Sequence, residues 1–482
     1  MNSKSGSDTQ LLQVLGRRDV LFLAFGSMIG WGWVVLAGDW INDAGSIGAV
    51  LAFLLGGLMV TFISLTYGEL TSAMPKAGGE QVFSWRALGP FWSFVCAWML
   101  VLAYVAVVAF EAVAMPTVLE YLVPAFRQVY LWNIAGWDVY LTWALVGSGG
   151  AIIMMIINYI GIKFAAIVQT VVVIFLMIIG VLFFGGALVN GQPAYLQPTF
   201  VGGMKGILTV AIMTPFMLVG FDIVPQAAEE MKIPSRTVGI ITIMGVILGA
   251  IWYMMIILAV SFSLPAGELS FASLVTADAM GVALGHPAWS KVMVVGGLCG
   301  IISTWNGFYI GGSRVLFAMA RAGQLPAFLG YIHPKYKTPS NAVILVGVLS
   351  ALVPFLGRMA LVWLTDAGGL ATVIAYFIVA VSFLVLRFKE PEMERPYKVF
   401  AGKAVGFIAA GLAFIFILFY LPGISPAALI WPYEWGIIFG WIILGAIFFI
   451  QAKKLGGDSE VNHRMRLIVL GKNTENISSS GS

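Results

Sequence analysis

The sequence has few charged residues for its length. Only 10% of its 482 residues are Asp, Glu, Lys or Arg, whereas a soluble globular domain carries about 25%. So small a charged fraction cannot cover a water-facing surface, and the mean hydropathy of +0.97 agrees with this conclusion. The composition therefore excludes an ordinary soluble protein and indicates a protein that is embedded in a membrane.

Cysteine and histidine are also scarce, which limits the chemistry available to the chain. The two cysteines, Cys96 and Cys299, lie in apolar stretches and are expected to pack there rather than form a disulfide or a metal site. The three histidines are scattered and form no ligand cluster. The sequence also lacks an HExxH zinc motif, a nucleophile–base set and a P-loop. We therefore expect no enzyme, no catalytic or metal-binding residues, no cofactor and no ATP-driven pump in this chain.

Long apolar runs are what the sequence does contain. A bilayer core about 30 Å thick is crossed by roughly 20 helical residues. Twelve segments of approximately this length are present, and they lack the short alternating pattern of barrel strands. Their bounds are 19–42, 46–73, 91–122, 139–160, 164–189, 206–229, 238–263, 289–320, 341–357, 360–386, 404–421 and 435–452. The predicted fold class is therefore an all-α polytopic membrane protein with about 12 transmembrane helices and no soluble domain.

The positive charges are divided unequally between alternate loops. With the N-terminus inside, 22 of the 26 Lys and Arg residues are cytoplasmic, and only Arg127, Lys205, Lys291 and Arg358 lie outside. Because positive loops stay in the cytoplasm, we expect both termini there, in a cell (inner or plasma) membrane. We see no signal peptide and expect the first apolar segment to remain in the mature protein. The polar tail after Gln451 is expected to be disordered.

Two of the apolar segments carry residues that interrupt a helix. Residues 26–32 include three glycines, and each weakens a helix by about 1 kcal/mol, although glycines also permit close helix packing. The sixth segment holds Pro215, Gly220, Asp222 and Pro225. Each proline removes a helix hydrogen bond, and an aspartate at mid-membrane depth is unfavourable without a partner. Both the first and the sixth helix are therefore predicted to be broken.

The spacing of the two breaks predicts an internal repeat. Interrupted helices five apart are typical of a five-plus-five inverted repeat, with a solute site between the breaks. The free amide and carbonyl groups there bind the charged ends of a solute. The predicted organisation is an N-terminal tail at 1–18, repeats at 19–189 and 206–386, helices 11 and 12 at 404–452, and a C-terminal tail at 453–482.

Several motifs resemble the amino acid–polyamine–organocation (APC) superfamily. They are FGSMIGWG at 25–32, YGEL at 67–70, MPKAGGE at 74–80, GFD at 220–222, AEEMKIP at 228–234, SRVLFAMARAGQLP at 313–326, LR at 386–387 and ERPYK at 394–398. These motifs cover helices one to ten in order. The resemblance implies a LeuT-like fold, alternating access, a site formed by helices one, three, six, eight and ten, and an amino acid or amine as solute.

Two positions depart from the pattern of that superfamily. Trp31 stands where members usually have a small residue, and it either narrows the pocket or turns into the helix interface. Phe175 and Leu176 occupy the region in which some relatives carry a lysine in place of a sodium ion. Proton coupling through that lysine is therefore not expected. The sequence leaves H⁺ coupling, Na⁺ coupling and exchange open.

Ionisable residues within the apolar segments are candidates for function. Glu111, in the third segment, either binds a substrate amine, takes up a proton, or forms a structural hydrogen bond. Asp222 either attracts an amine, orients the unwound backbone, or caps the second half-helix. Glu229 and Glu230 form an inner gate with the arginines at 17–18, or are interfacial charges. The candidate substrate-binding residues are Ser27, Ile29, Gly30, Trp31, Gly32, Glu111, Gly220, Phe221, Asp222 and Trp305.

These observations predict a secondary active transporter for an amino acid or a related small amine. The alternative substrate is a polyamine or an ethanolamine-like amine, carried by transport or exchange. A passive channel and a membrane sensor are further alternatives, and saturable uptake with counterflow separates a carrier from a channel. The expected partners are the solute and the lipid bilayer. Nucleic acid is not expected to bind, and the sequence leaves the oligomeric state open.

Overall fold

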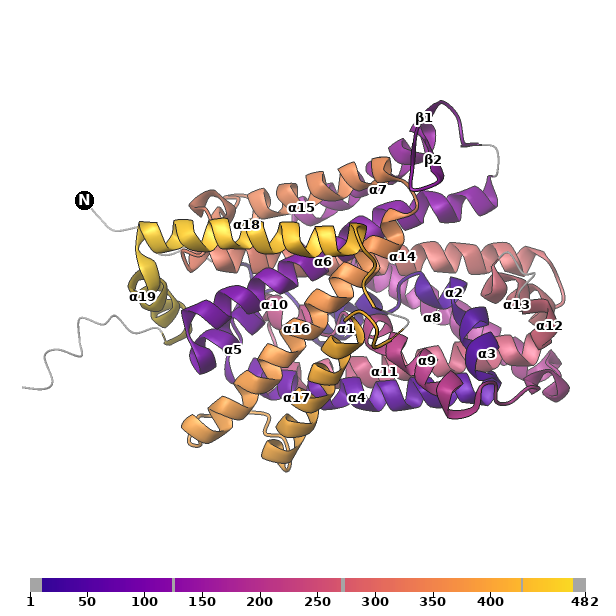
Figure 1. The fold of residues 1–482 in the computed structure, drawn as a ribbon, viewed down its shortest axis with the longest axis horizontal. Helices are drawn as coiled ribbons and strands as arrows, with labels where there is room; N and C mark the ends of the chain where they lie inside the picture. The colour runs from indigo at the N-terminus through magenta and orange to yellow at the C-terminus, as the bar shows by residue number, and fades with distance from the viewer. Residues whose placement is uncertain (1–10, 124–125, 270–273, 426–427, 471–482) are drawn as a thin grey trace, which may run out of the picture.

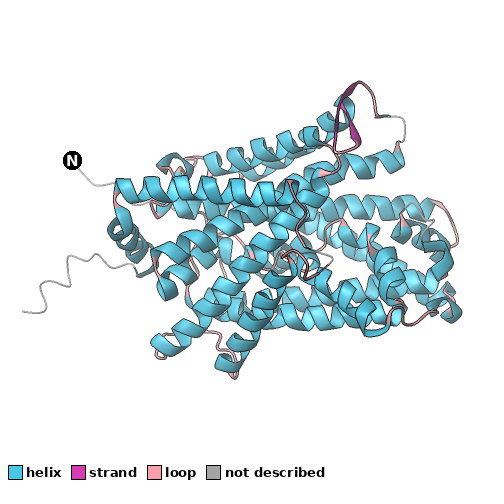
Figure 2. Ribbon diagram, viewed as in Figure 1, coloured by secondary structure: helices cyan, strands magenta, loops and turns pink. Residues whose placement is uncertain are grey.

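The structure is a computed structural model that describes residues 11–123, 126–269, 274–425 and 428–470. The chain is almost wholly helical, and one short antiparallel hairpin joins β1 (Tyr130–Ile134) to β2 (Trp137–Tyr140) (Figures 1 and 2). Within the described residues, nine helices are long and apolar enough to cross a membrane. The prediction of an all-α polytopic membrane protein is therefore confirmed.

The twelve predicted segments all correspond to helical structure, but three of them are short or interrupted. The nine long helices are α4 (Ser46–Ala73), α6 (Pro90–Leu122), α7 (Leu141–Ile160), α8 (Ile162–Asn190), α11 (Ser235–Ser263), α14 (Ala288–Arg321), α16 (Ala360–Lys389), α17 (Gly402–Phe419) and α18 (Tyr433–Leu455). The first segment is divided into α1 (Arg17–Met28), α2 (Gly32–Val35) and α3 (Ala37–Ala44). The sixth comprises α9 (Gly203–Met217) and α10 (Ile223–Gln226), and the ninth α15 (Ser340–Leu352) and η5 (Val353–Leu356). The number of twelve crossings stays a prediction.

The long helices pack in pairs around the interrupted first helix. Helix α4 lies along α11 and α9, α6 lies against α14 and α16, and α7 lies along α15. Helix α1 contacts α8, α11 and α14, so it occupies the interior of the bundle. Helix α18 runs along the outside (Figure 1), and most of its apolar side chains are exposed. An exposed apolar face of this kind is suited to contact with lipid.

Short elements cover both ends of the bundle. At one end lie α5 (Gly79–Leu88) and α19 (Gly457–Leu470), at the left in Figure 1. We call this the basic end, because Arg314, Arg321, Arg387 and Arg395 form ion pairs there. At the opposite end lie α12 (Ala266–Leu269) and α13 (Val275–Ala283), at the right in Figure 1. The remaining short elements are the 3-10 turns η2 (Pro193–Leu196), η3 (Ala228–Glu230) and η4 (Ala327–Gly330).

The prediction of a disordered C-terminal tail is wrong for residues 452–470. Helix α18 continues to Leu455, and α19 then packs back on α5 and α6. Val461 and Met465 are buried, and the indole Nε1 of Trp85 donates a 2.9 Å hydrogen bond to Asn462. Val461 and Met465 lie four apart and therefore share one face of α19, which is the face turned towards the bundle. Residues 1–10 and 471–482 of the two predicted tails lie outside the described residues.

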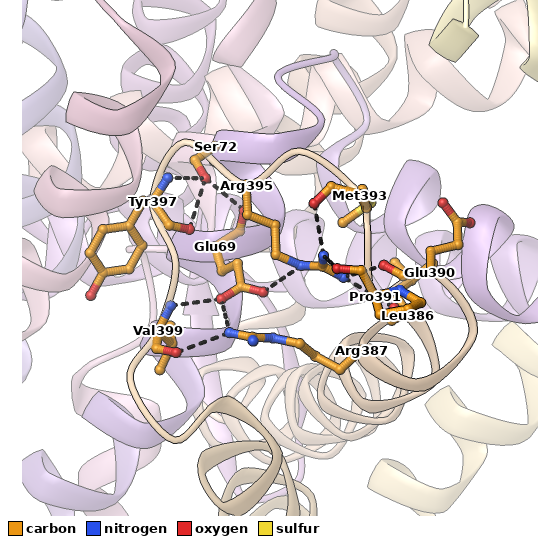
Figure 3. A network of polar contacts seen from close by, with 10 residues as sticks. All are labelled: Glu69, Ser72, Leu386, Arg387, Glu390, Pro391, Met393, Arg395, Tyr397 and Val399. Atoms are coloured by element: carbon orange, nitrogen blue, oxygen red, sulfur yellow. Dashed lines mark hydrogen bonds and ion pairs between the residues drawn. The ribbon is translucent and has the colours of Figure 1, made fainter.

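A buried glutamate fixes the loop that follows α16 (Figure 3). Glu69, near the end of α4, is fully buried and forms ion pairs with Arg387 and, at 2.9 Å, with Arg395. Its Oε2 also accepts a 2.7 Å hydrogen bond from the backbone N–H of Val399. Two guanidinium groups and one backbone amide therefore converge on the Glu69 carboxyl group. The loop from 390 to 401 is thereby folded over the end of α4.

Candidate functional site

The two predicted helix breaks are present and touch each other. Residues 29–31 separate α1 from α2, and residues 218–222 separate α9 from α10. Gly220 has a positive φ of 129°, which favours glycine. A Cβ atom at Gly220 would lie 2.8 Å from the carbonyl carbon of Ser27, so the two chains are in direct contact. The fold therefore brings both interruptions to one place in the interior.

The first break leaves backbone amide groups available. Among the described residues, the N–H groups of Gly30, Trp31 and Gly32 donate to no protein acceptor. The adjacent Met28 carbonyl, by contrast, accepts a hydrogen bond from the Tyr253 hydroxyl at 3.0 Å. Unpaired amide groups at the start of a helical segment form a site for an anionic group.

Glu111 lies opposite these amides. Its side chain is 2% exposed, and its Oε1 would be 3.1 Å from a Cβ atom at Gly30. The Oε2 atom has no hydrogen-bond partner. Gly30 itself is only half-buried. The arrangement places a carboxyl group beside free amides, as a molecule with one positive and one negative end requires.

Asp222 is used to hold the second break. Its Oδ1 accepts the N–H of Gly220 at 2.8 Å, and its Oδ2 accepts the hydroxyl of Tyr104 at 2.9 Å. The same hydroxyl also reaches the Asp222 carbonyl at 3.1 Å. No capping hydrogen bond from the Asp222 side chain to α10 is formed. Of its predicted roles, orientation of the unwound backbone is the one that these contacts support.

The remaining candidates near the breaks pack against neighbouring helices. The Ile29 carbonyl oxygen lies against Gly300 of α14, where a Cβ atom would be 2.9 Å away. The ring of Phe221 lies 5.2 Å from the ring of Tyr67 and 5.4 Å from that of Tyr376. Phe221 therefore packs against α4 and α16 and not towards Glu111.

The two candidate tryptophans serve helix packing. The indole of Trp31 lies on Gly297 of α14, where an added Cβ would be 2.2 Å from its Cζ3. Of the two alternatives for Trp31, the structure has the one in which it turns into the helix interface. The indole of Trp305 lies against Gly150 of α7, where an added Cβ would be 3.0 Å from its Cη2. Trp305 is therefore directed away from the first break.

Two further residues line the first break and were missed by sequence reasoning. The Thr304 hydroxyl donates a 3.2 Å hydrogen bond to the Ser27 carbonyl, and it would lie 3.0 Å from a Cβ at Gly30. The sulfur of Met217 would lie 2.8 Å from a Cβ at Gly32. A signal for Thr304 did exist, because positions four apart on a helix share one face and Gly300 precedes it on α14.

Neutral amides join α1, α8 and α14 beneath the first break. The Nε2 of Gln169 donates to the Phe22 carbonyl at 3.2 Å and to Ser303 Oγ at 2.9 Å. Its Oε1 accepts from the Nδ2 of Asn306 at 2.9 Å. Of the two residues in the region where some superfamily members have a lysine, Leu176 is fully buried and Phe175 is exposed. This junction is therefore held by uncharged groups.

The predicted inner gate uses different arginines. Glu230 pairs with Arg314 at 2.8 Å, and both side chains are fully buried. Glu229 pairs with Arg321 at 2.8 Å. Pairing with the arginines at 17–18 is therefore wrong, because the end of α14 brings its own arginines to these glutamates. Both pairs nevertheless join the sixth segment to α14 at the basic end.

A backbone seam closes the same end. Leu15 and Met231 form a parallel bridge, in which the N–H groups of Val14 and Leu15 donate to the Glu230 carbonyl at 2.9 and 3.0 Å. The N–H of Lys232 donates to the Leu15 carbonyl at 2.8 Å. The chain entering α1 is thus tied to the chain leaving the sixth segment.

Comparison with known proteins agrees with this architecture. The amino acid permease family matches residues 19–438. The methylthioribose transporter of Bacillus subtilis is 28% identical over 462 residues, covering 94% of this chain and 96% of the relative. The branched-chain amino acid permease BcaP of the same organism is 27% identical over 484 residues, covering 93% and 95%. The vacuolar cationic amino acid transporter 4 of Arabidopsis thaliana is 27% identical over 409 residues, covering 81% and 66%.

These relatives are permeases and transporters, so the predictions of a secondary transporter for amino acids and of no enzymatic activity are confirmed. The resemblance to the APC superfamily is confirmed by the same match. The chain belongs to the amino acid permease family.

Proposed function

We propose that the protein binds an amino acid between its two helix breaks and carries it by alternating access. The free amides of Gly30, Trp31 and Gly32 are suited to the carboxylate of the solute. Glu111, opposite them, is suited to the ammonium group. The single observation that carries the proposal is this pairing of free amides with a buried, unsatisfied carboxyl group.

The position of Trp31 supports a carboxylate bound at the first break. Because its indole lies on Gly297 of α14, it leaves the neighbouring amides uncovered. A decarboxylated amine, such as ethanolamine or a polyamine, would leave the same amides without a partner. We therefore place an amino acid ahead of a simple amine as the substrate, and two relatives are named as permeases or transporters of branched-chain or cationic amino acids.

A neutral solute is the second candidate. One relative that covers nearly the full chain is named as a methylthioribose transporter. A thio-sugar has hydroxyl groups that could donate to Glu111 and accept from the amides, without a charge of its own. The sulfur of Met217 beside Gly32 would suit a thioether through soft, polarizable contact. A panel of ligands separates the two candidates.

Orientation and repeat structure belong to the same proposal. We place the basic end and both termini in the cytoplasm of a cell (inner or plasma) membrane, because 22 of 26 Lys and Arg residues fall on that side. We assign residues 19–189 and 206–386 to two inverted repeats, with helices 11 and 12 at 404–452. The pairs α4–α11, α6–α14 and α7–α15 support this assignment, because each joins corresponding helices of the two halves.

Thermal unfolding of the purified protein tests the substrate. A ligand bound only to the native state at about 100 times its Kd stabilises it by about 2.7 kcal/mol. We expect L-isoleucine or L-arginine to raise the melting temperature, with methylthioribose, ethanolamine and putrescine as the competing ligands. A rise with ethanolamine or putrescine alone would contradict the amide site for a carboxylate.

The variant Glu111→Gln tests the ammonium site in the same assay. Loss of a charge-assisted hydrogen bond of about 1.5–3 kcal/mol weakens binding more than tenfold, so the ligand-induced shift should largely disappear. Glu120→Gln is the matched control, because this glutamate of α6 pairs with Arg127 away from the breaks. Equal shifts in wild type and Glu111→Gln would remove Glu111 from the site.

A further inference from the structure

A second carboxyl group is buried without a cation, at the basic end of the bundle. Glu80 is the second residue of α5, and its side chain is fully buried. Its Oε2 accepts a hydrogen bond from the side-chain amide of Gln226 on α10, whereas its Oε1 has no partner. The Oε1 of Gln226 and the hydroxyl of Tyr67 are likewise buried without partners. Two buried acceptor oxygens, Glu80 Oε1 and Gln226 Oε1, therefore receive no hydrogen bond from the described residues.

The groups that face Glu80 carry no positive charge. Gln226, its hydrogen-bond partner, is neutral. The titratable groups close enough to interact with Glu80 are Asp222, Tyr67, Cys96, Tyr104 and Tyr376. Two nearby cations are engaged elsewhere, because Arg86 of α5 and Arg314 of α14 each pair with another glutamate. Helix α19 meets α5 through the neutral side chain of Asn462.

These surroundings favour the protonated form of the Glu80 carboxyl group. An ionised carboxylate in a dry interior is strongly disfavoured unless a cation or several donors compensate it. Burial raises the pKa of Glu80 well above its usual range, and the neighbouring Asp222 carboxyl raises it further. Protonation also removes the charge from the Oε1 atom, which receives no hydrogen bond. The burial of Glu80 and the lack of a cation beside it therefore favour its neutral form while the basic end is closed.

Glu80 lies where opening of the basic end would expose it. A Cβ atom at Gly79 would lie 2.6 Å from Pro225, so α5 rests directly on α10. Helix α10 follows the second break, and such breaks are where transporter helices bend. A displacement of α10 would remove Gln226 from Glu80 and admit water to the carboxyl group.

The junction of α1, α8 and α14, a second place where a proton could bind, is formed by uncharged side chains. Phe175 and Leu176 occupy the region in which the resemblance implies a lysine for some members, and Gln169 joins α1, α8 and α14 through amide hydrogen bonds alone. Neither Gln169 nor Leu176 can therefore take up or release a proton at this junction.

We propose that Glu80 is a proton-binding site of the transport cycle, which is loaded while the basic end is closed and emptied when it opens. On opening, the carboxyl O–H bond breaks and the proton passes to water on the basic side. The remaining carboxylate is hydrated until the end closes again, and it then forms a new O–H bond with a proton supplied from the opposite side of the membrane. This inference rests on the proposed function and orientation, and it adds the group that couples transport to a proton gradient.

Infrared difference spectroscopy of the purified protein tests the proton directly and needs no substrate. We expect wild type minus Glu80→Gln at neutral pH to show the C=O band of one protonated carboxyl group. Glu69→Gln is the control, because Glu69 is paired with two arginines and should contribute no such band. A Glu80→Asp variant, which keeps the carboxyl group, should show a shifted band. Absence of the band in the Glu80 comparisons would overturn the proposal.

Uptake into proteoliposomes tests the coupling. With radiolabelled L-isoleucine and L-arginine as probes, we expect wild-type uptake to rise when the outside is acidified, and Glu80→Gln to lose this response. A response of equal size in the variant would overturn the coupling role. If wild type transports neither probe, the proposed substrate fails, whereas the infrared result still decides the state of Glu80.

Discussion

Two sets of buried glutamates have opposite surroundings in this molecule. Glu69 and Glu230 are fully buried and each is paired with arginine, in one case with two. Glu80 and Glu111 are buried to a similar degree, and among the described residues each has an oxygen that is neither hydrogen-bonded nor ion-paired. The paired set fastens helix ends and loops together, whereas the unpaired set lies beside the two helix breaks.

The difference teaches where charge is fixed and where it is free to change. A carboxylate held by guanidinium groups keeps one protonation state, because loss of the charge leaves the cations unpaired. A carboxyl group without a cation can exchange its proton or its ligand at lower cost. The ion pairs of Glu69 and Glu230 therefore hold parts of the structure together, whereas Glu80 and Glu111 are the candidates for binding a ligand or a proton during transport.

Breaking the most buried pair should have the largest effect. Arg314→Met leaves Glu230 as an uncompensated buried charge, and we expect a loss of about 3–5 kcal/mol in the free energy of unfolding. Unfolding in mixed detergent micelles measures this change. The double variant Arg314→Met/Glu230→Met should recover most of the loss. A double variant as unstable as the single one would show that the charge is not the cause.

The same substitution in the two sets sharpens the comparison. Glu69→Gln removes the anion between two arginines and should destabilise by about 2–4 kcal/mol. Glu80→Gln replaces a neutral carboxyl group by a neutral amide and should change stability by less than about 1 kcal/mol. The micelle assay compares the two variants directly. Equal losses would mean that Glu80 is held as a carboxylate too.

A half-exposed pair should have the smallest effect. The side chains of Arg86 and Glu390 are 21% and 35% exposed, although they meet at 2.6 Å. Pairs in contact with water contribute about 0–1 kcal/mol, so Arg86→Gln should be nearly neutral. Its residual effect should decrease as salt is raised. A loss as large as that of Arg314→Met would contradict burial as the deciding factor.

The fold was predictable from the sequence because each of its main signals is local. The length of the apolar run alone predicts the segment 46–73, and these are the bounds of α4 in the structure. Glycines and prolines likewise mark both broken helices, since their effect on the backbone does not depend on distant partners. The sequence did not predict that residues 457–470 form helix α19, because this helix is stabilised by contacts with α5 and α6, through which Val461 and Met465 are buried.

The candidate site was less predictable because it depends on which way side chains point. The contact of Gly220 with Ser27 and the closeness of Glu111 to Gly30 agree with the expected place of the site, while their roles stay predictions. Trp305 was assigned by residue type, but the adjacent Thr304 is the residue on the face towards α1. The sequence contains many glutamates and arginines at helix ends, and only the three-dimensional path selects their partners.

The seam between Leu15 and Met231 has a mechanical consequence. Its three hydrogen bonds join main-chain atoms, so replacing the side chains there changes the packing without deleting a donor or an acceptor. Because of this strand-like pairing, the chain that enters α1 and the chain that leaves the sixth segment are expected to move together. Any swing that pulls α1 away from α14 must either carry residues 230–232 along or rupture all three bonds at once.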